Sequence, residues 1–124
     1  MGTLRAQLAS VPIAELVLRL TALVAIVYAA QSEVLEAFFV VIAGAGLVAP
    51  ALLRRSGFWV TLLVLSALFH GLKWSSIDNH KVLFAYWLLA VALALKTATV
   101  SESLGRAGRL LIGACFACGL FWKL

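Results

Sequence analysis

The sequence has few charged residues, and acidic residues are the scarcest of them. Only 12% of its 124 residues are charged, with five Asp or Glu against ten Lys or Arg, whereas 65% are hydrophobic. In soluble domains about a quarter of all residues are charged, so the composition disfavours a soluble domain. It predicts an integral membrane protein, placed by expectation in a bacterial inner membrane.

Scarce cysteines and missing repeats exclude further classes. Cys115 and Cys118 lie in one hydrophobic run, so a secreted scaffold held by disulfides is not indicated. No internal period of about 20 to 50 residues and no low-complexity tract occurs, which argues against a repeat solenoid or a disordered tail. We therefore expect one helical domain over residues 1–124.

The net charge of +5 is a feature that nucleic-acid-binding proteins also have. Nucleic-acid-binding domains gather their basic residues on one face, whereas here they are scattered between hydrophobic runs. Short cytoplasmic loops of membrane proteins favour Lys and Arg, and this explains the charge better. We expect a lipid bilayer as partner and no nucleic acid.

Hydrophobic runs divide the chain into helices. About 20 apolar residues are needed for a helix to cross a hydrocarbon core of about 30 Å. The expected helices cover residues 12–31, 34–53, 57–74, 80–98 and 107–123. Pro50 is expected to kink or end the second helix, and a polar link from Thr97 to Arg109 precedes the last. The predicted fold class is all-α: a polytopic transmembrane bundle of five helices, or of four if the last run does not span.

Loop charges predict the orientation, with the N-terminus in the cytoplasm. The cations then expected on the cytoplasmic side are Arg5, Arg54, Arg55, Lys96, Arg106 and Arg109. Those expected outside are Lys73, Lys81 and Lys123.

Two charges interrupt the first hydrophobic run. Glu15 and Arg19 are spaced i,i+4, so they can meet on one helix face, and we expect an intramembrane ion pair. A proton or anion site between helices is the sharper alternative. The same two charges argue against a cleaved signal peptide.

Polar groups concentrate around one expected extracytoplasmic turn, residues 73–81. The candidate ligand-binding residues are His70, Lys73, Asp78, Asn79, His80 and Lys81. An imidazole beside an ammonium and an amide can bind a lipid headgroup or a quinone, or act as an acid or base. The spacing matches no named zinc or iron pattern, so no metal is expected.

Cys115 and Cys118 form a Cys-x-x-Cys motif, as in membrane enzymes that couple disulfides to quinones. A thiolate in the middle of a hydrophobic run is costly, so packing of small side chains is the simpler interpretation. A redox role for this pair stays an alternative.

The segment Trp74-Ser-Ser-Ile-Asp-Asn79-His80-Lys-Val-Leu83 resembles the Asn-His stretch of vitamin K-dependent gamma-glutamyl carboxylases, whose bacterial relatives carry the horizontally transferred transmembrane (HTTM) domain. The end of the chain, Gly119-Leu-Phe-Trp-Lys123-Leu124, is similar to a later helix of that family, and Arg19 suits its early Arg. The resemblance covers only the family's N-terminal helices. DoxX-like proteins share such a Lys-Leu ending.

That resemblance implies candidate catalytic residues, namely Asn79 and His80 at the active region and Lys123 as a base toward a hydroquinone. The leading hypothesis is an HTTM-like bundle with a lipid or quinone pocket at residues 73–81. One alternative is a structural or accessory subunit, bound to other membrane subunits or to its own copies. Others are a quinone-linked thiol oxidoreductase and a small transporter.

Overall fold

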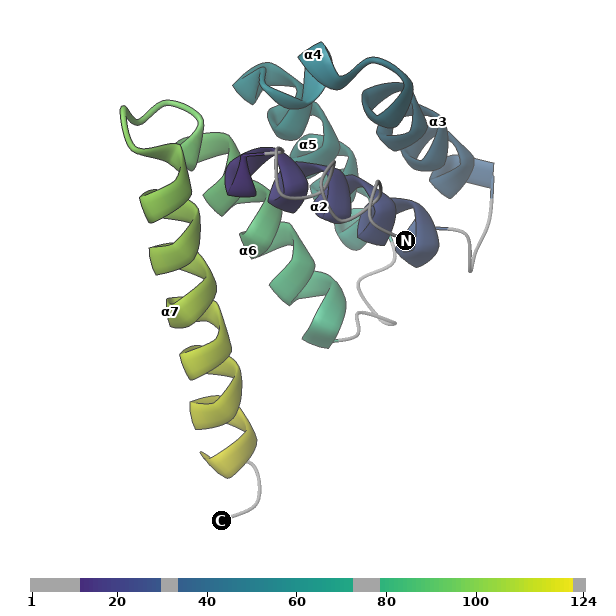
Figure 1. Cartoon of the computed structure of the whole chain (residues 1–124). Coiled ribbons are helices and arrows are strands. Elements are labelled where there is room, and N and C mark those ends of the chain that lie inside the picture. Colours follow the sequence, from purple (N-terminus) through teal and green to yellow (C-terminus); the bar gives the residue numbers. More distant parts are fainter. Residues whose placement is uncertain (1–11, 30–33, 73–78, 122–124) are drawn as a thin grey trace, which may run out of the picture.

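The computed structural model describes residues 12–29, 34–72 and 79–121 (Figure 1). Within them the chain forms six helices and no strand, which confirms the all-α class. The helices are α2 (Ile13–Ala29), α3 (Val34–Val48), α4 (Pro50–Leu53), α5 (Ser56–Leu72), α6 (Asn79–Ala94) and α7 (Val100–Phe121).

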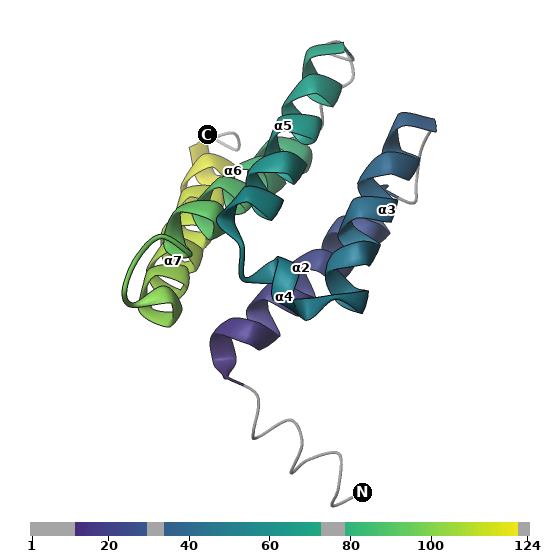
Figure 2. The same cartoon turned by 90° about the horizontal axis from the view of Figure 1, so that it is seen from above.

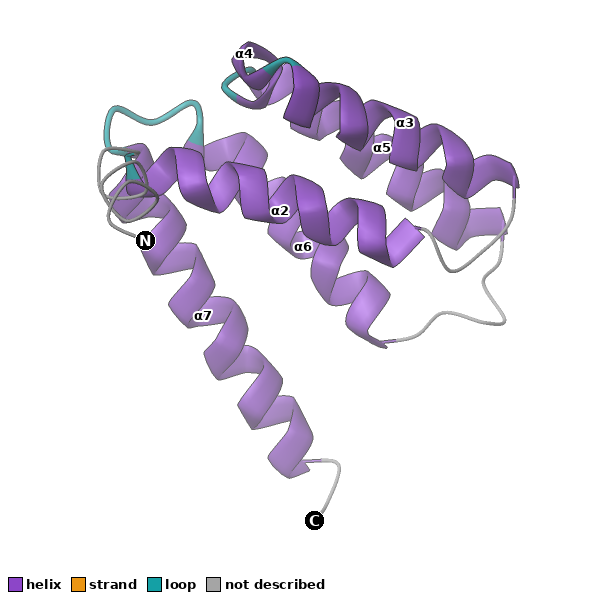
Figure 3. Ribbon diagram, turned by 45° about the vertical axis from the view of Figure 1, so that its right-hand side comes forward, coloured by secondary structure: helices purple, strands orange, loops and turns teal. Residues whose placement is uncertain are grey.

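The helices form two groups that face each other across the core. Seen from above, α2, α3 and α4 lie on one side, and α5, α6 and α7 on the other (Figure 2). The start of α2, the α4–α5 turn and the link at residues 95–99 meet at one end of the bundle, on the left in Figure 3. We call this the basic end, because Arg54, Arg55 and Lys96 lie there, all exposed.

Pro50 divides the second predicted helix as expected. α3 ends at Val48, and Pro50 opens the four-residue α4. Proline has no backbone N–H to continue the helical hydrogen bonds, and it moves the preceding residue away from helical geometry. Ala49 accordingly has φ −118° and ψ 82°. The predicted 34–53 span is therefore two helices separated by a sharp bend.

The predicted polar link from Thr97 to Arg109 is wrong beyond residue 99, because α7 already begins at Val100. Its first turn is closed by a hydrogen bond from Ser103 N to Thr99 O at 3.0 Å. Glu102 and Arg106 then pair at 2.6 Å with i,i+4 spacing. A helix surface tolerates such paired charges, so polarity alone did not mark a loop here.

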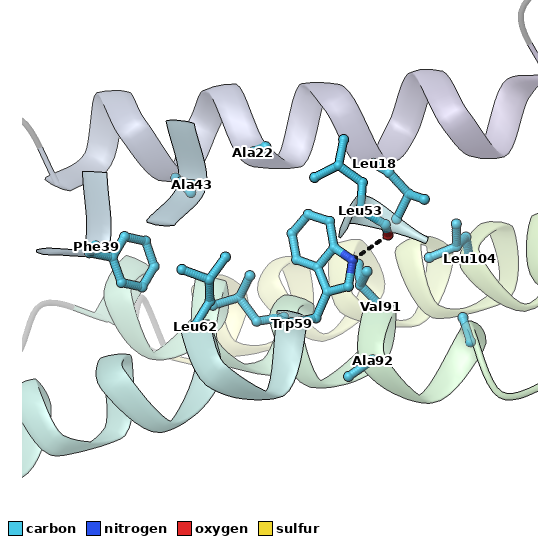
Figure 4. Close-up of a cluster of buried hydrophobic side chains, with 13 residues drawn as sticks. Leu18, Ala22, Phe39, Ala43, Leu53, Trp59, Leu62, Val91, Ala92 and Leu104 are labelled. Atoms are coloured by element: carbon cyan, nitrogen blue, oxygen red, sulfur yellow. Dashed lines mark hydrogen bonds between the residues drawn. The ribbon is translucent and has the colours of Figure 1, made fainter. Parts of the chain in front are cut away.

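Trp59 of α5 lies at the centre of the buried core, between the two helix groups (Figure 4). Its side chain is fully buried, and its Nε1–H donates to the Leu53 carbonyl of α4 at 2.8 Å. The ring also meets the Phe58 ring edge to face, with centroids 5.1 Å apart. Leu18 of α2 and Leu104 of α7 belong to the same cluster.

A second tryptophan hydrogen bond, which is half-buried, links α6 to α2. The indole N–H of Trp87 donates to the Thr21 hydroxyl at 3.0 Å, and that hydroxyl donates to the Val17 carbonyl at 2.8 Å. Thr21 is only 4% exposed. Buried hydroxyl and indole groups need partners, and here they satisfy each other across the bundle.

Large apolar side chains also cover outward faces. Leu23 and Val27 of α2, Phe38 and Val41 of α3, and Leu68 of α5 are all at least 47% exposed.

Within the described residues, no helix combines the length and the apolar character that crossing a membrane requires.

Candidate functional site

A carboxylate held by two arginines lies at the basic end. Glu15 Oε1 accepts a hydrogen bond from Arg19 Nη2 at 2.6 Å, and Glu15 Oε2 accepts one from Arg54 Nη2, also at 2.6 Å. The Glu15 side chain is 16% exposed, whereas those of Arg19 and Arg54 are 44% and 67% exposed. We call these three residues the ion cluster.

The structure shows the Glu15–Arg19 contact that the i,i+4 spacing predicted, whereas its place within a membrane stays a prediction. The sequence reasoning missed Arg54 as a partner. Arg54 is the residue that caps the end of α4, 39 positions from Glu15. The signal lay in topology: α2 and α3 run antiparallel, so the end of the second predicted helix returns to the start of the first. Arg54 thereby ties α4 to α2.

The ion cluster retains positive charge. Two guanidinium groups against one carboxylate leave a net charge of +1, and the exposed Arg55 beside Arg54 raises it to +2. Arg106 and Arg109, predicted in a cytoplasmic loop, lie instead within α7. Both are exposed, and Arg106 pairs with Glu102.

A groove runs between α6 and α7. It has a volume of about 430 Å³, and its lining is entirely apolar. The lining residues are Leu83, Phe84 and Trp87 on α6, and Gly108, Leu111, Ile112, Cys115 and Phe116 on α7. Such a groove suits an apolar chain, because it offers dispersion contacts and no polar group that would lose hydration.

Gly108 of α7 lies on the wall of the groove beside Trp87. A Cβ atom at this position would lie 3.7 Å from the Trp87 ring, in ordinary van der Waals contact. Beyond Gly108, α7 diverges from the bundle (Figures 1 and 3), and Leu110, Ile112 and Phe116 are 71%, 61% and 72% exposed. The groove opens because α7 leaves α6.

The side chains of all six ligand-binding residues predicted from the sequence lie outside the described part. Lys73 and Asp78 fall outside the described residues altogether, and so does the candidate catalytic base Lys123. His70 belongs to α5, and Asn79, His80 and Lys81 begin α6, but their side chains are not among those described. The pocket predicted at residues 73–81 therefore stays a prediction.

Of the two cysteines, Cys115 is a free thiol that lines the groove. The Cys118 side chain lies outside the described part, so the redox alternative stays a prediction. Among the described side chains, no three His, Cys, Asp or Glu groups come close enough to hold a metal ion. The described residues form two separate candidate sites, the apolar groove and the ion cluster.

Comparisons with known proteins bear on the predicted resemblance to the HTTM and carboxylase family. No family model matches the chain, and no curated protein and no solved structure does so either. The resemblance therefore stays a prediction from the two short motifs.

Proposed function

We propose that the chain is an integral membrane protein that holds the apolar tail of a lipid or a quinone in the groove between α6 and α7. The observation that carries this proposal is the groove itself, which is entirely apolar and about 430 Å³ in volume. The basic end would face the cytoplasm, since its exposed arginines follow the positive-inside rule.

The apolar exterior supports a membrane location. Covering a large aliphatic or aromatic side chain contributes about 1.5 to 3 kcal/mol, and side chains such as Val41 and Phe116 are about 70% exposed. α2 and α5 each have 17 residues, or about 25 Å of helix. A bilayer accommodates such short helices by thinning locally, at a modest cost per ångström.

The helical register of α6 supports a place for the ligand's polar headgroup at the end of the groove that lies nearest the start of α6. α6 begins at Asn79, one helical turn before the groove residue Leu83, and His80 precedes Phe84 by the same spacing. A tail in the groove would thus carry its headgroup toward the start of α6. This would suit an HTTM-like bundle with a quinone or lipid ligand, with Asn79 and His80 as hydrogen-bond partners.

Quenching of tryptophan fluorescence tests the groove, because Trp87 lines it. We expect saturable quenching of the detergent-purified chain by a quinone with an isoprenoid tail or by a phospholipid with brominated acyl chains. A quinone without a tail should bind at least about tenfold more weakly, because each buried methylene contributes about 0.8 kcal/mol. The two reagents distinguish a quinone from a lipid.

A glycine pair supplies matched variants for the same titration. Gly108→Leu would place a side chain in the groove beside Trp87, whereas Gly113→Leu would point into open space. Binding should weaken severalfold in the first variant and stay unchanged in the second. Equal binding by all three proteins would show that neither ligand occupies the groove.

The exposed second half of α7 favours one further candidate, an accessory subunit or homo-oligomer. Gly113 has no atom within 4 Å of a Cβ position, so a neighbouring helix could approach it closely. Gly46 of α3, by contrast, lies inside the chain against Leu53 and Phe58. A monomer as the sole species in mild detergent would count against this candidate.

A further inference from the structure

Among the residues that the structure describes, the ion cluster uses two of its guanidinium N–H donors. A guanidinium group carries five N–H donors, and Glu15 accepts one bond from Arg19 and one from Arg54. Both arginine side chains are substantially exposed, at 44% and 67%. Glu15 therefore holds the two guanidinium groups near each other without exhausting them.

Charge and geometry at this place suit a phosphate group. Arginine binds phosphate through paired N–H donors, and such charge-assisted hydrogen bonds are about twice as strong as neutral ones. Glu15 cancels only one of the two charges, and the exposed Arg55 adds another. An anion can thus approach two guanidinium groups that are already positioned by the same carboxylate.

An exposed apolar strip begins directly at the ion cluster. On α2, Leu16 and Leu23 lie one turn on either side of Arg19, and they are 37% and 47% exposed. The strip continues along the helix through Leu20 and Val27, which are 51% and 65% exposed. A free phosphate would gain nothing from this strip, whereas an acyl chain would cover it.

We propose that Arg19 and Arg54 bind the phosphate of an anionic phospholipid, whose acyl chains lie along the outward face of α2. The site shares no residue with the groove between α6 and α7. Glu15 acts as a positioning residue that sets the two guanidinium groups and competes weakly with the phosphate for their donors.

The test is native mass spectrometry of the full chain in neutral detergent, titrated with dioleoyl phosphatidylglycerol, with dioleoyl phosphatidylcholine or with inorganic phosphate. We expect preferential binding of phosphatidylglycerol, reduced about tenfold by Arg54→Gln or Arg19→Gln, the loss that follows from one charge-assisted hydrogen bond. Arg106→Gln is the matched control, because Arg106 is 69% exposed, pairs with Glu102 at 2.6 Å and makes the same change in charge.

Glu15→Gln separates positioning from net charge. The amide has only one acceptor oxygen, so it cannot hold both guanidinium groups, and affinity for phosphatidylglycerol should fall severalfold. A rise in affinity would mean that net charge alone attracts the lipid, and would overturn the positioning role of Glu15. An equal loss in Arg54→Gln and Arg106→Gln would overturn the proposal in favour of net charge alone. Displacement of the lipid by millimolar inorganic phosphate would overturn the assignment to a phospholipid.

Discussion

Replacing Trp59 with alanine should destabilise the protein by about 3 to 5 kcal/mol, the range for removing a large buried aromatic side chain. Trp59 is fully buried and touches both halves of the bundle through its place in the core. Its removal would leave a cavity that the surrounding helices can close only in part. The Leu53 carbonyl would also lose its indole partner.

A second variant separates these contributions. Trp59→Phe keeps much of the ring volume but cannot donate to Leu53, so its cost should be about 1 to 3 kcal/mol. Both values can be measured as free energies of unfolding in mixed micelles titrated with sodium dodecyl sulfate and followed by circular dichroism. Val60→Ala, at a 40% exposed neighbouring position, is the control and should change little. A Trp59→Ala protein as stable as that control would contradict this account of the core.

Gly46→Val should destabilise the protein by about 1 to 3 kcal/mol through overpacking. A Cβ atom at Gly46 would lie 2.6 Å from Leu53 Cδ2 and 2.7 Å from Phe58 Cζ. Both distances are shorter than van der Waals contact, so the α4 and α5 side chains would have to move. Since Phe58 packs on Trp59, the displacement would reach the centre of the core.

Gly44 provides the opposite result on the same helix. A Cβ atom there would meet nothing within 4 Å, and alanine favours a helix over glycine by up to about 1 kcal/mol. Gly44→Ala should therefore stabilise the protein in the same unfolding titration. Two changes of the same sign would mean that α3 does not pack on α4 and α5 as described.

Local chemistry was a good guide to the break between α3 and α4. Pro50 ended α3 because a missing N–H and a steric clash act within a few residues, whatever the tertiary structure. The start of α7 was misjudged, because Glu102 and Arg106 look like loop residues until their i,i+4 pairing is counted. Polarity marks a loop only where no helix partner satisfies the charge.

The candidate sites also combine contacts that the sequence predicts locally with contacts that only the tertiary structure creates. The spacing of Glu15 and Arg19 predicted their ion pair, since both residues lie on one helix. The second partner, Arg54, lies 39 positions away at the end of a separate helix. No local sequence pattern links two residues that far apart. The groove is of the same kind, because its two walls come from α6 and α7 and their divergence follows from packing along the whole bundle.

Hydrophobic runs, turn residues and i,i+4 pairs settle the all-helical class and one ion pair, because these depend on interactions within a few positions of the chain. Packing of distant segments settles what those elements build together. It brings Arg54 to Glu15, buries Trp59 between the helix groups and leaves the second half of α7 beside an open groove. Contacts of this kind depend on side-chain shape and chain reversal across the whole molecule, which no short window of residues contains.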